Sequence, residues 1–323
     1  MTRGRLVLCL LGAILTPGVA AAAGDVGRLP GARAIKVCAG AGPYWPTMTL
    51  ALRGTSAWIA CKEQSRVVRV DTRTGRTTKS VRLGAPVIAV ASGFGSIWAV
   101  DSSGTLSRLN ATSGKVARVI RLGVVAAYNI WIGGGSVWVA DDQGARVVRV
   151  SPGTGKVVAR IRVGDGPADM AFNGSTAWVI NHRDRSVTRI ALGTNTTSKL
   201  VVLDGDAPER MVWHRGSLWI TGRGTDLLKV NPADGSAEET IEIGASGIDV
   251  AAAGDALWVP TRSAETDERG FPTMDALKRV SATSGAVSTV ARATGRLDVH
   301  GLATASGRVW LADNTSGFLY TTP

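Results

Sequence analysis

The sequence predicts an all-β fold, a seven-bladed β-propeller made of four-stranded antiparallel blades. A strand motif with a central tryptophan recurs along the chain, each copy holds short β-branched runs separated by turn residues, and the last copy lacks its fourth run. Successive motifs lie about forty residues apart, a period typical of radially repeated β architectures. The tryptophans that mark the copies are Trp58, Trp98, Trp138, Trp178, Trp219, Trp258 and Trp310.

The third copy illustrates the four strands of one blade. The expected strands cover residues 129–132, 136–140, 147–150 and 156–163. Gly, Pro, Asp, Asn or Ser bounds each run, as hairpin-linked strands require. In five copies a glycine closes the turn before the fourth strand, where we expect a positive φ: Gly75, Gly114, Gly155, Gly235 and Gly285.

A basic residue also recurs on the third strand of six copies. Because it follows the period of the scaffold, we expect it to form salt bridges at the blade edges. The six residues are Arg69, Arg108, Arg149, Arg189, Lys229 and Arg279.

The two ends of the chain predict how the ring closes. The last copy has expected strands at residues 301–305, 308–312 and 318–321, but its fourth strand is missing. Residues 33–38 fit the fourth-strand pattern and precede the first blade. We therefore expect residues 33–38 to complete the last blade, which leaves no open seam in the ring.

Residues 1–23 have the composition of a secretory signal peptide. Two arginines, an apolar core over residues 6–15 and a run of alanines follow one another. We therefore expect residues 24–323 to be one exported domain, secreted or periplasmic, with no membrane span, and we expect a monomer.

Cys38 and Cys61 are the two cysteines outside the expected signal peptide. In an oxidising compartment, an even pair of this kind predicts a disulfide rather than a metal site.

The formal net charge is +12. Such an excess can indicate nucleic acid, anionic cell-wall polymers or lipid headgroups as partners. The lysines and arginines are spread over all copies, without a basic run and with few aromatic neighbours. This distribution favours an ordinary solvated surface without specific nucleic-acid binding, and an anionic envelope component is the alternative.

The residues that differ between copies are better site candidates than those that repeat. Near the start of the innermost strand, nine residues before the tryptophan, four successive copies carry Asn129, Asp169, Arg210 and Asp249. We expect these side chains at the mouth of the central channel, where they would bind a polar ligand or cation. The alternative is an internal ion-pair cluster that closes the channel with water.

A second group surrounds the last tryptophan. Asp298 and His300 precede Trp310, and Asp313 follows it. The start of the first strand and the end of the second reach the same face of a blade, so these side chains should converge. They can serve as a general base, hold a hard cation, or form a structural hydrogen-bond network.

The sixth copy carries a polar insertion at residues 261–276. Its composition fits a functional loop and a disordered loop equally.

The chain resembles the virginiamycin B lyase (streptogramin lyase) family and, more loosely, the YVTN and NHL-type repeat propellers. The tryptophan strand carries the architectural part of this resemblance. The more specific part is His300-Gly-Leu302 through Trp310 to Asp313-Asn314, together with Asp298 and a Gly42-Pro-Tyr44 entry to the first blade.

The resemblance implies a carbon–oxygen lyase that linearises a cyclic depsipeptide by elimination, with Mg²⁺ as the candidate cofactor. It assigns His300 as general base, Asp298 and Asp313 to the neighbourhood of the cation, and Tyr44 to the substrate. The chain departs from the family pattern at Ile248, where the family has another histidine, and at Asn314, where it has the acid. We therefore expect a binding module for a small molecule, peptide or envelope component, with a Mg²⁺-assisted lyase or lactone- or ester-opening enzyme as the alternative.

Overall fold

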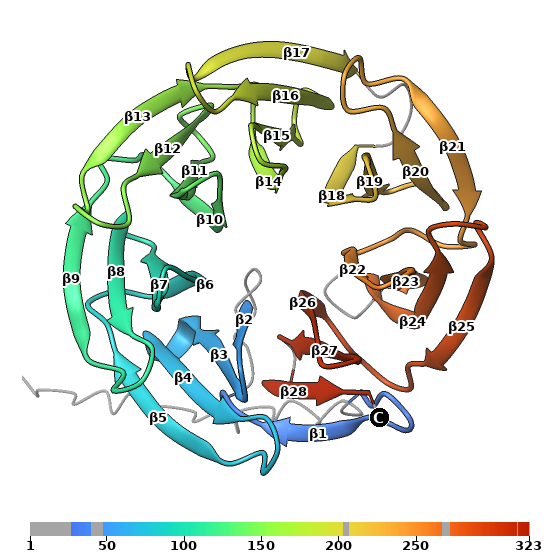
Figure 1. Ribbon diagram of the computed structural model, residues 1–323. Helices are drawn as coiled ribbons and strands as arrows, with labels where there is room; N and C mark the ends of the chain where they lie inside the picture. Colours follow the sequence, from blue (N-terminus) through green and yellow to red (C-terminus); the bar gives the residue numbers. More distant parts are fainter. Residues whose placement is uncertain (1–26, 40–47, 203–206, 267–271, 315, 323) are drawn as a thin grey trace, which may run out of the picture.

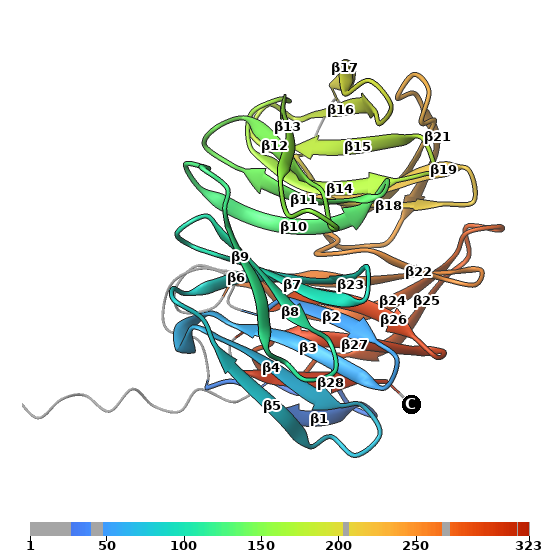
Figure 2. The same cartoon turned by 60° about the vertical axis from the view of Figure 1, so that its left-hand side comes forward.

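The strands form seven four-stranded antiparallel sheets that follow one another around a ring (Figure 1). The computed structural model describes residues 27–39, 48–202, 207–266, 272–314 and 316–322. In each sheet the first strand borders the central channel and the fourth forms the outer wall (Figures 1 and 2). The predicted all-β, seven-bladed propeller is confirmed.

Within blades 1 to 6, chain order runs from the innermost strand to the outermost. Blades 1 to 3 consist of β2 Leu50–Arg53, β3 Ser56–Cys61, β4 Arg66–Asp71 and β5 Thr77–Arg82; β6 Val87–Gly93, β7 Ser96–Asp101, β8 Thr105–Asn110 and β9 Val116–Arg121; and β10 Ala127–Gly133, β11 Ser136–Asp141, β12 Arg146–Val150 and β13 Val157–Arg162. A short 3₁₀ turn, η1 Lys62–Gln64, joins β3 to β4.

Blades 4 to 6 continue the same order. They consist of β14 Pro167–Phe172, β15 Thr176–Asn181, β16 Ser186–Ala191 and β17 Thr196–Val202; β18 Pro208–His214, β19 Ser217–Gly222, β20 Asp226–Val230 and β21 Ala237–Glu242; and β22 Ala251–Ala253, β23 Ala256–Thr266, β24 Pro272–Ser281 and β25 Val287–Arg292. Blade 7 contains β26 Val299–Ala305, β27 Arg308–Asp313, β28 Phe318–Thr321 and, as its outermost strand, β1 Arg33–Lys36.

The N-terminal strand closes the ring, as the sequence predicted. β1 pairs antiparallel with β28, from Arg33 opposite Thr321 to Lys36 opposite Phe318. The predicted strand was two residues longer. At that end, the N–H groups of Val37 and Cys38 both donate to the carbonyl of Gly317, so the regular ladder stops while the contact continues.

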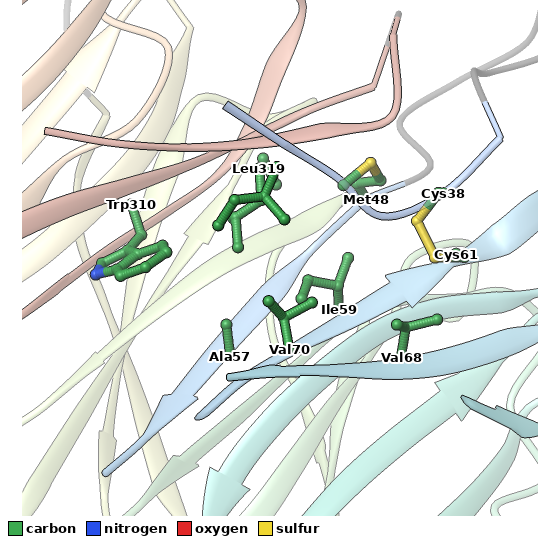
Figure 3. Close-up of a cluster of buried hydrophobic side chains, with 11 residues drawn as sticks. Cys38, Met48, Ala57, Ile59, Cys61, Val68, Val70, Trp310 and Leu319 are labelled. Atoms are coloured by element: carbon green, nitrogen blue, oxygen red, sulfur yellow. A yellow bond between two sulfur atoms is a disulfide. The ribbon is translucent and has the colours of Figure 1, made fainter. Parts of the chain in front are cut away.

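The seam between blades 7 and 1 is held by an apolar cluster and the predicted disulfide (Figure 3). Ile59, Trp310 and Leu319 are buried in this cluster. Cys38 and Cys61 form the disulfide, with a Cα–Cα distance of 5.6 Å. The bridge ties the segment that follows β1 to the second strand of blade 1.

On blades 1 to 3, the repeated cations of the third strands form no salt bridge with any residue that the structure describes, contrary to expectation. The guanidinium Nε donates a 2.8 Å hydrogen bond to a serine hydroxyl. The group also lies 5.2 to 5.8 Å from the centroid of a buried tryptophan ring, a cation–π contact. The sets are Arg69 with Ser56 and Trp58, Arg108 with Ser96 and Trp98, and Arg149 with Ser136 and Trp138. Lys229 does form an ion pair, at 3.7 Å from Glu238.

The glycines that close the turns before the fourth strands have the expected positive φ, between 68° and 82°. In blade 4 the corresponding turn uses Asn195, with φ 61°. Asparagine tolerates this region better than most residues with a side chain, so the turn type is retained.

The insertion in blade 6 is a strand extension over the residues that the structure describes. β23 and β24 continue outward as a long hairpin, up to Thr266 opposite Pro272. Arg262 on this hairpin forms a bidentate ion pair with Glu209 of blade 5, at 2.7 and 2.8 Å. The hairpin is therefore tied to its neighbouring blade.

The expected signal peptide, residues 1–23, lies outside the described residues and stays a prediction. Within the described ranges, no helix has the length and apolar character needed to cross a membrane.

Replacement of both Cys38 and Cys61 by alanine should lower the free energy of unfolding by about 3 kcal/mol, because the bridge restricts the unfolded chain. Urea unfolding under oxidising conditions measures the loss. A reducing agent should destabilise the parent and leave the double variant unchanged. Equal midpoints for the parent and the variant would contradict a stabilising role for the bridge.

Candidate functional site

Five innermost strands carry a β-bulge near the repeat position that the sequence singled out. The pairing register shifts between residues 87 and 89, 127 and 130, 167 and 169, 208 and 210, and 299 and 301. A bulge bends a strand and re-aims a side chain, and bulges are frequent beside functional sites. Asn129, Asp169 and Arg210 lie at these irregularities, and Asp249 lies just before β22.

Asp169 is a buried carboxylate that connects three blades. Its Oδ1 accepts hydrogen bonds from the indole N–H of Trp131 at 2.8 Å and from the Met170 N–H at 2.9 Å. Its Oδ2 accepts a 2.7 Å bond from the Met211 N–H of blade 5. Burial raises the pKa of Asp169, although Arg210 opposes the shift. These contacts give Asp169 a structural function, because they join blades 3, 4 and 5.

Arg210 lies in the electrostatic field of Asp169 and Asp249 but forms no direct ion pair within the described part of the chain. Its Nη1 donates a 2.7 Å hydrogen bond to the carbonyl of Glu209. Burial alone would lower the pKa of the guanidinium, but Tyr128, Asp249 and Asp169 raise it above its ordinary value. The group is therefore charged and retains N–H donors for other partners.

Asp249 is a half-buried carboxyl group beside Arg210 and His300. Its Oδ1 accepts a 2.8 Å hydrogen bond from the Val250 N–H. Burial raises its pKa to about 7, Asp169 adds to the rise, and Arg210 and His300 oppose it. Asp249 can therefore change its protonation state near neutral pH.

Asn129 occupies the equivalent position on blade 3. Its Oδ1 accepts a 2.8 Å hydrogen bond from the Ile130 N–H. The three charged residues of the predicted group are electrostatically coupled, whereas Asn129 is connected to them through its blade, by way of Trp131 and Asp169.

A shallow hollow of about 290 Å³ lies beside this polar group on the innermost strands of blades 1 to 3. Leu50, Leu52, Val90, Ile130 and Trp131 contribute to its lining. Trp131 links the two regions, because it lines the hollow and its indole N–H donates to Asp169. Trp131 was not among the site residues predicted from the sequence, where its signal was a tryptophan outside the repeated position.

His300 and Asp298 form a close pair on blade 7. The imidazole Nε2 lies 2.9 Å from Asp298 Oδ1, and the side chains are 21% and 31% exposed. Since the carboxylate accepts, Nε2 carries the proton in this contact. The other ring nitrogen, Nδ1, is buried without a hydrogen-bond partner among the described residues. His300 also acts electrostatically on Asp249, so this pair borders the channel-mouth group.

Asp313 and Asn314 contact the same loop, and the Asn314 Nδ2 also donates to Asp298 Oδ2 at 3.5 Å. Asp313 is fully buried, and it accepts hydrogen bonds from the Asp298 N–H at 2.9 Å and from the N–H and hydroxyl of Ser316. Asn314 Oδ1 accepts a 2.7 Å bond from the Met48 N–H of blade 1. These contacts are typical of residues that shape a turn and join two blades.

The described residues contain no group of three or more His, Cys, Asp or Glu side chains arranged to hold a metal ion. Asp313 is occupied by protein donors, which does not fit a ligand of Mg²⁺ in this arrangement. The metal role expected for Asp298 and Asp313 stays a prediction. Tyr44 lies outside the described residues.

Asp249→Asn should remove a pH dependence of stability. The folded pKa of this acid is about 7, above its unfolded value, so its contribution is fully present in acid and is lost as pH rises toward 7. The ionised form costs on the order of a few kcal/mol at neutral pH, which asparagine avoids. Urea midpoints between pH 4 and 8 should fall more steeply for the parent than for the variant. Parallel profiles would contradict this assignment.

The comparisons with known proteins concern the fold. No protein-family model matches the chain, and no curated protein matches it. A crystal structure of selenomethionine-substituted virginiamycin B lyase from Staphylococcus aureus is similar, with a TM-score of 0.72 at 15% identity, covering 92% of this chain and 99% of that one. The computationally designed Ika8 protein has a TM-score of 0.66 at 11% identity, covering 85% and 83%. At these identities, both similarities establish the propeller architecture alone.

Proposed function

We propose that the chain is an exported propeller that binds a small ligand at the mouth of its central channel. The proposal rests on Arg210. Among the described residues this charged guanidinium forms no direct ion pair, although Asp169 and Asp249 act on it electrostatically, so it is suited to receive an acceptor group from a ligand.

The neighbours of Arg210 indicate the chemical class of the ligand. The pKa values of Asp169 and Asp249 are raised, which weakens the negative charge around the guanidinium as the solution becomes acidic. The hollow beside Trp131 can take an apolar group. We therefore infer a small amphiphile that carries a carboxylate, carbonyl or other acceptor next to an apolar body.

Export is part of this proposal. The Cys38–Cys61 bridge fits an oxidising compartment, and residues 1–23 have the sequence of a signal peptide. A secreted or periplasmic location follows from both features, and the partner is a small molecule, a peptide or an envelope component.

Arg210→Gln should weaken the binding of 8-anilinonaphthalene-1-sulfonate at least tenfold. This probe joins an anionic sulfonate to an apolar ring system, and a hydrogen bond to a charged donor is worth about 1.5–3 kcal/mol. Fluorescence titration measures the affinity, which should increase for the parent as pH falls through 7 because Asp249 becomes neutral.

Arg308→Gln is the matched control, because this exposed arginine lies at the start of β27, away from the group around Arg210. It should bind the probe as the parent does. If the parent fails to bind, or if both variants lose affinity equally, the channel-mouth site is refuted.

The pair of His300 and Asp298 favours a second candidate function, an enzyme that opens a lactone or ester. In a neutral imidazole that donates from Nε2 to Asp298, the lone pair that can accept a proton is at Nδ1. In an elimination, His300 would take a proton from carbon, the electrons of that bond would form a carbon–carbon double bond, and the neighbouring carbon–oxygen bond of the ester would break to release a carboxylate. A substrate would have to reach Nδ1, which is buried.

His300→Asn tests this candidate with a cyclic depsipeptide as substrate, with and without added Mg²⁺. If the enzyme hypothesis is correct, the parent should linearise the substrate and the variant should lose at least a hundredfold in kcat, because general-base catalysis contributes that much. Mass spectrometry follows the opened product, and circular dichroism checks the fold. No turnover by the parent, or equal turnover by the variant, would reject the enzyme.

A further inference from the structure

The outermost strand of each blade carries charges of one sign only. The outermost strands of blades 7, 1, 2 and 3 follow one another along the outer wall (Figure 1) and bear exposed cations without a carboxylate. We define these residues as the basic arc: Arg33 and Lys36 on β1, Lys79 and Arg82 on β5, Arg118 and Arg121 on β9, and Arg160 and Arg162 on β13. Elsewhere on the ring, β21 carries three glutamates and no cation.

The ring gathers cations that the sequence spreads far apart. Arg82, Arg121 and Arg162 each end the outermost strand of their blade. Each one is paired in register with the first residue of the neighbouring third strand. They therefore occupy one repeat position on three adjacent blades, about forty residues apart in the chain.

Several cations of the basic arc face another cation directly across the ladder. The opposed pairs are Arg82 with Arg66, Lys79 with Arg69, Arg118 with Arg108, and Arg162 with Arg146. Like charges directly opposite each other destabilise a sheet. A charged edge strand protects against edge-to-edge aggregation, but that protection does not require a second cation on the neighbouring strand. Some of the facing cations have partners of their own, such as Arg146 with Asp141, but the like-charged pairs still concentrate positive charge on this wall.

Half of the basic arc has no polar partner in the described part of the protein. Arg33, Lys36, Arg118 and Arg160 donate to backbone carbonyls. Lys79, Arg82, Arg121 and Arg162 form no side-chain hydrogen bond or ion pair with any residue that the structure describes. Their charged groups are exposed and can bind an external anion.

We propose that the basic arc binds a flexible linear polyanion that carries phosphate groups along its backbone. Arginine, which provides six of the eight cations, binds phosphate oxygens through its fork of N–H donors. The outer wall is convex, so a flat bilayer touches only part of it, whereas a flexible chain can follow all four strands. These strands contain no Phe, Tyr or Trp on which bases could stack, which disfavours single-stranded nucleic acid.

The test uses long-chain inorganic polyphosphate and the variant Arg82→Gln/Arg121→Gln/Arg162→Gln. The affinity of the parent should fall linearly on a log–log plot against salt concentration. The triple variant should bind at least tenfold more weakly. The slope of its log–log salt plot should be smaller by about two, because binding with fewer phosphate contacts releases fewer counterions. Replacement of the same residues by lysine should retain most of the slope.

The matched control is Arg53→Gln/Arg292→Gln/Arg308→Gln, which removes the same charge from exposed positions outside the basic arc. Arg292 holds the equivalent strand-end position on blade 6. The control should lose less than threefold, and Arg210→Gln should bind the polymer as the parent does. Circular dichroism checks that each variant is folded.

Three results would overturn the proposal. The parent could fail to bind polyphosphate at low salt, or the control could lose as much affinity as the test variant, which would reduce the effect to net charge. Tighter binding to vesicles of anionic phospholipid or to oligo-dT, at equal phosphate concentration, would assign the basic arc to a membrane or to nucleic acid instead.

Discussion

Antiparallel pairing between β1 and β28 is the contact on which the rest of the molecule depends. The radius of a ring of sheets is set only when its last blade is complete. This radius determines where each innermost strand lies around the channel. The disulfide and the apolar cluster between blades 7 and 1 support this pairing. Blades 3 to 7 contribute separate side chains to the group around Arg210, so their relative placement depends on the closed ring.

The repeat itself made the fold predictable. The spacing of the tryptophans predicts the number of blades, the turn glycines help to predict the strand order, and the missing fourth strand predicts the closure. These signals are clear because every copy has the same local geometry. Counting back from the tryptophans also selected Asp169, Arg210 and Asp249, which act electrostatically on one another in the structure. The bulges at these positions were not, because a single extra residue in a ladder leaves no clear pattern. Likewise, Arg69 looks like a salt-bridge residue until Trp58 and Ser56 are known to lie beside it.

The distribution of charge over the surface was also hard to predict from the sequence. Cations that are evenly spread in sequence suggest a plain solvated surface, yet a period near forty residues brings equivalent positions of neighbouring blades onto one wall. Asp313 was a candidate for the active site that the structure explains as a turn residue. Its position after Trp310 suggests a catalytic or metal-binding role, but Asp101 holds the equivalent place in blade 2 and also accepts hydrogen bonds from the turn that follows it. Side-chain partners across a turn decide such roles, and sequence spacing does not contain them.

We infer that Arg210 and Asp249 serve a ligand rather than the stability of the ring. Urea unfolding of the double variant Arg210→Met/Asp249→Asn at pH 7 tests this most directly. Replacing a buried charged group by uncharged side chains of similar size is often neutral or stabilising, and Asp169 keeps its three N–H donors. We predict an unfolding free energy equal to or above that of the parent, together with lost binding of the amphiphilic probe. A loss of more than about 3 kcal/mol would instead identify the group as a structural ion-pair cluster.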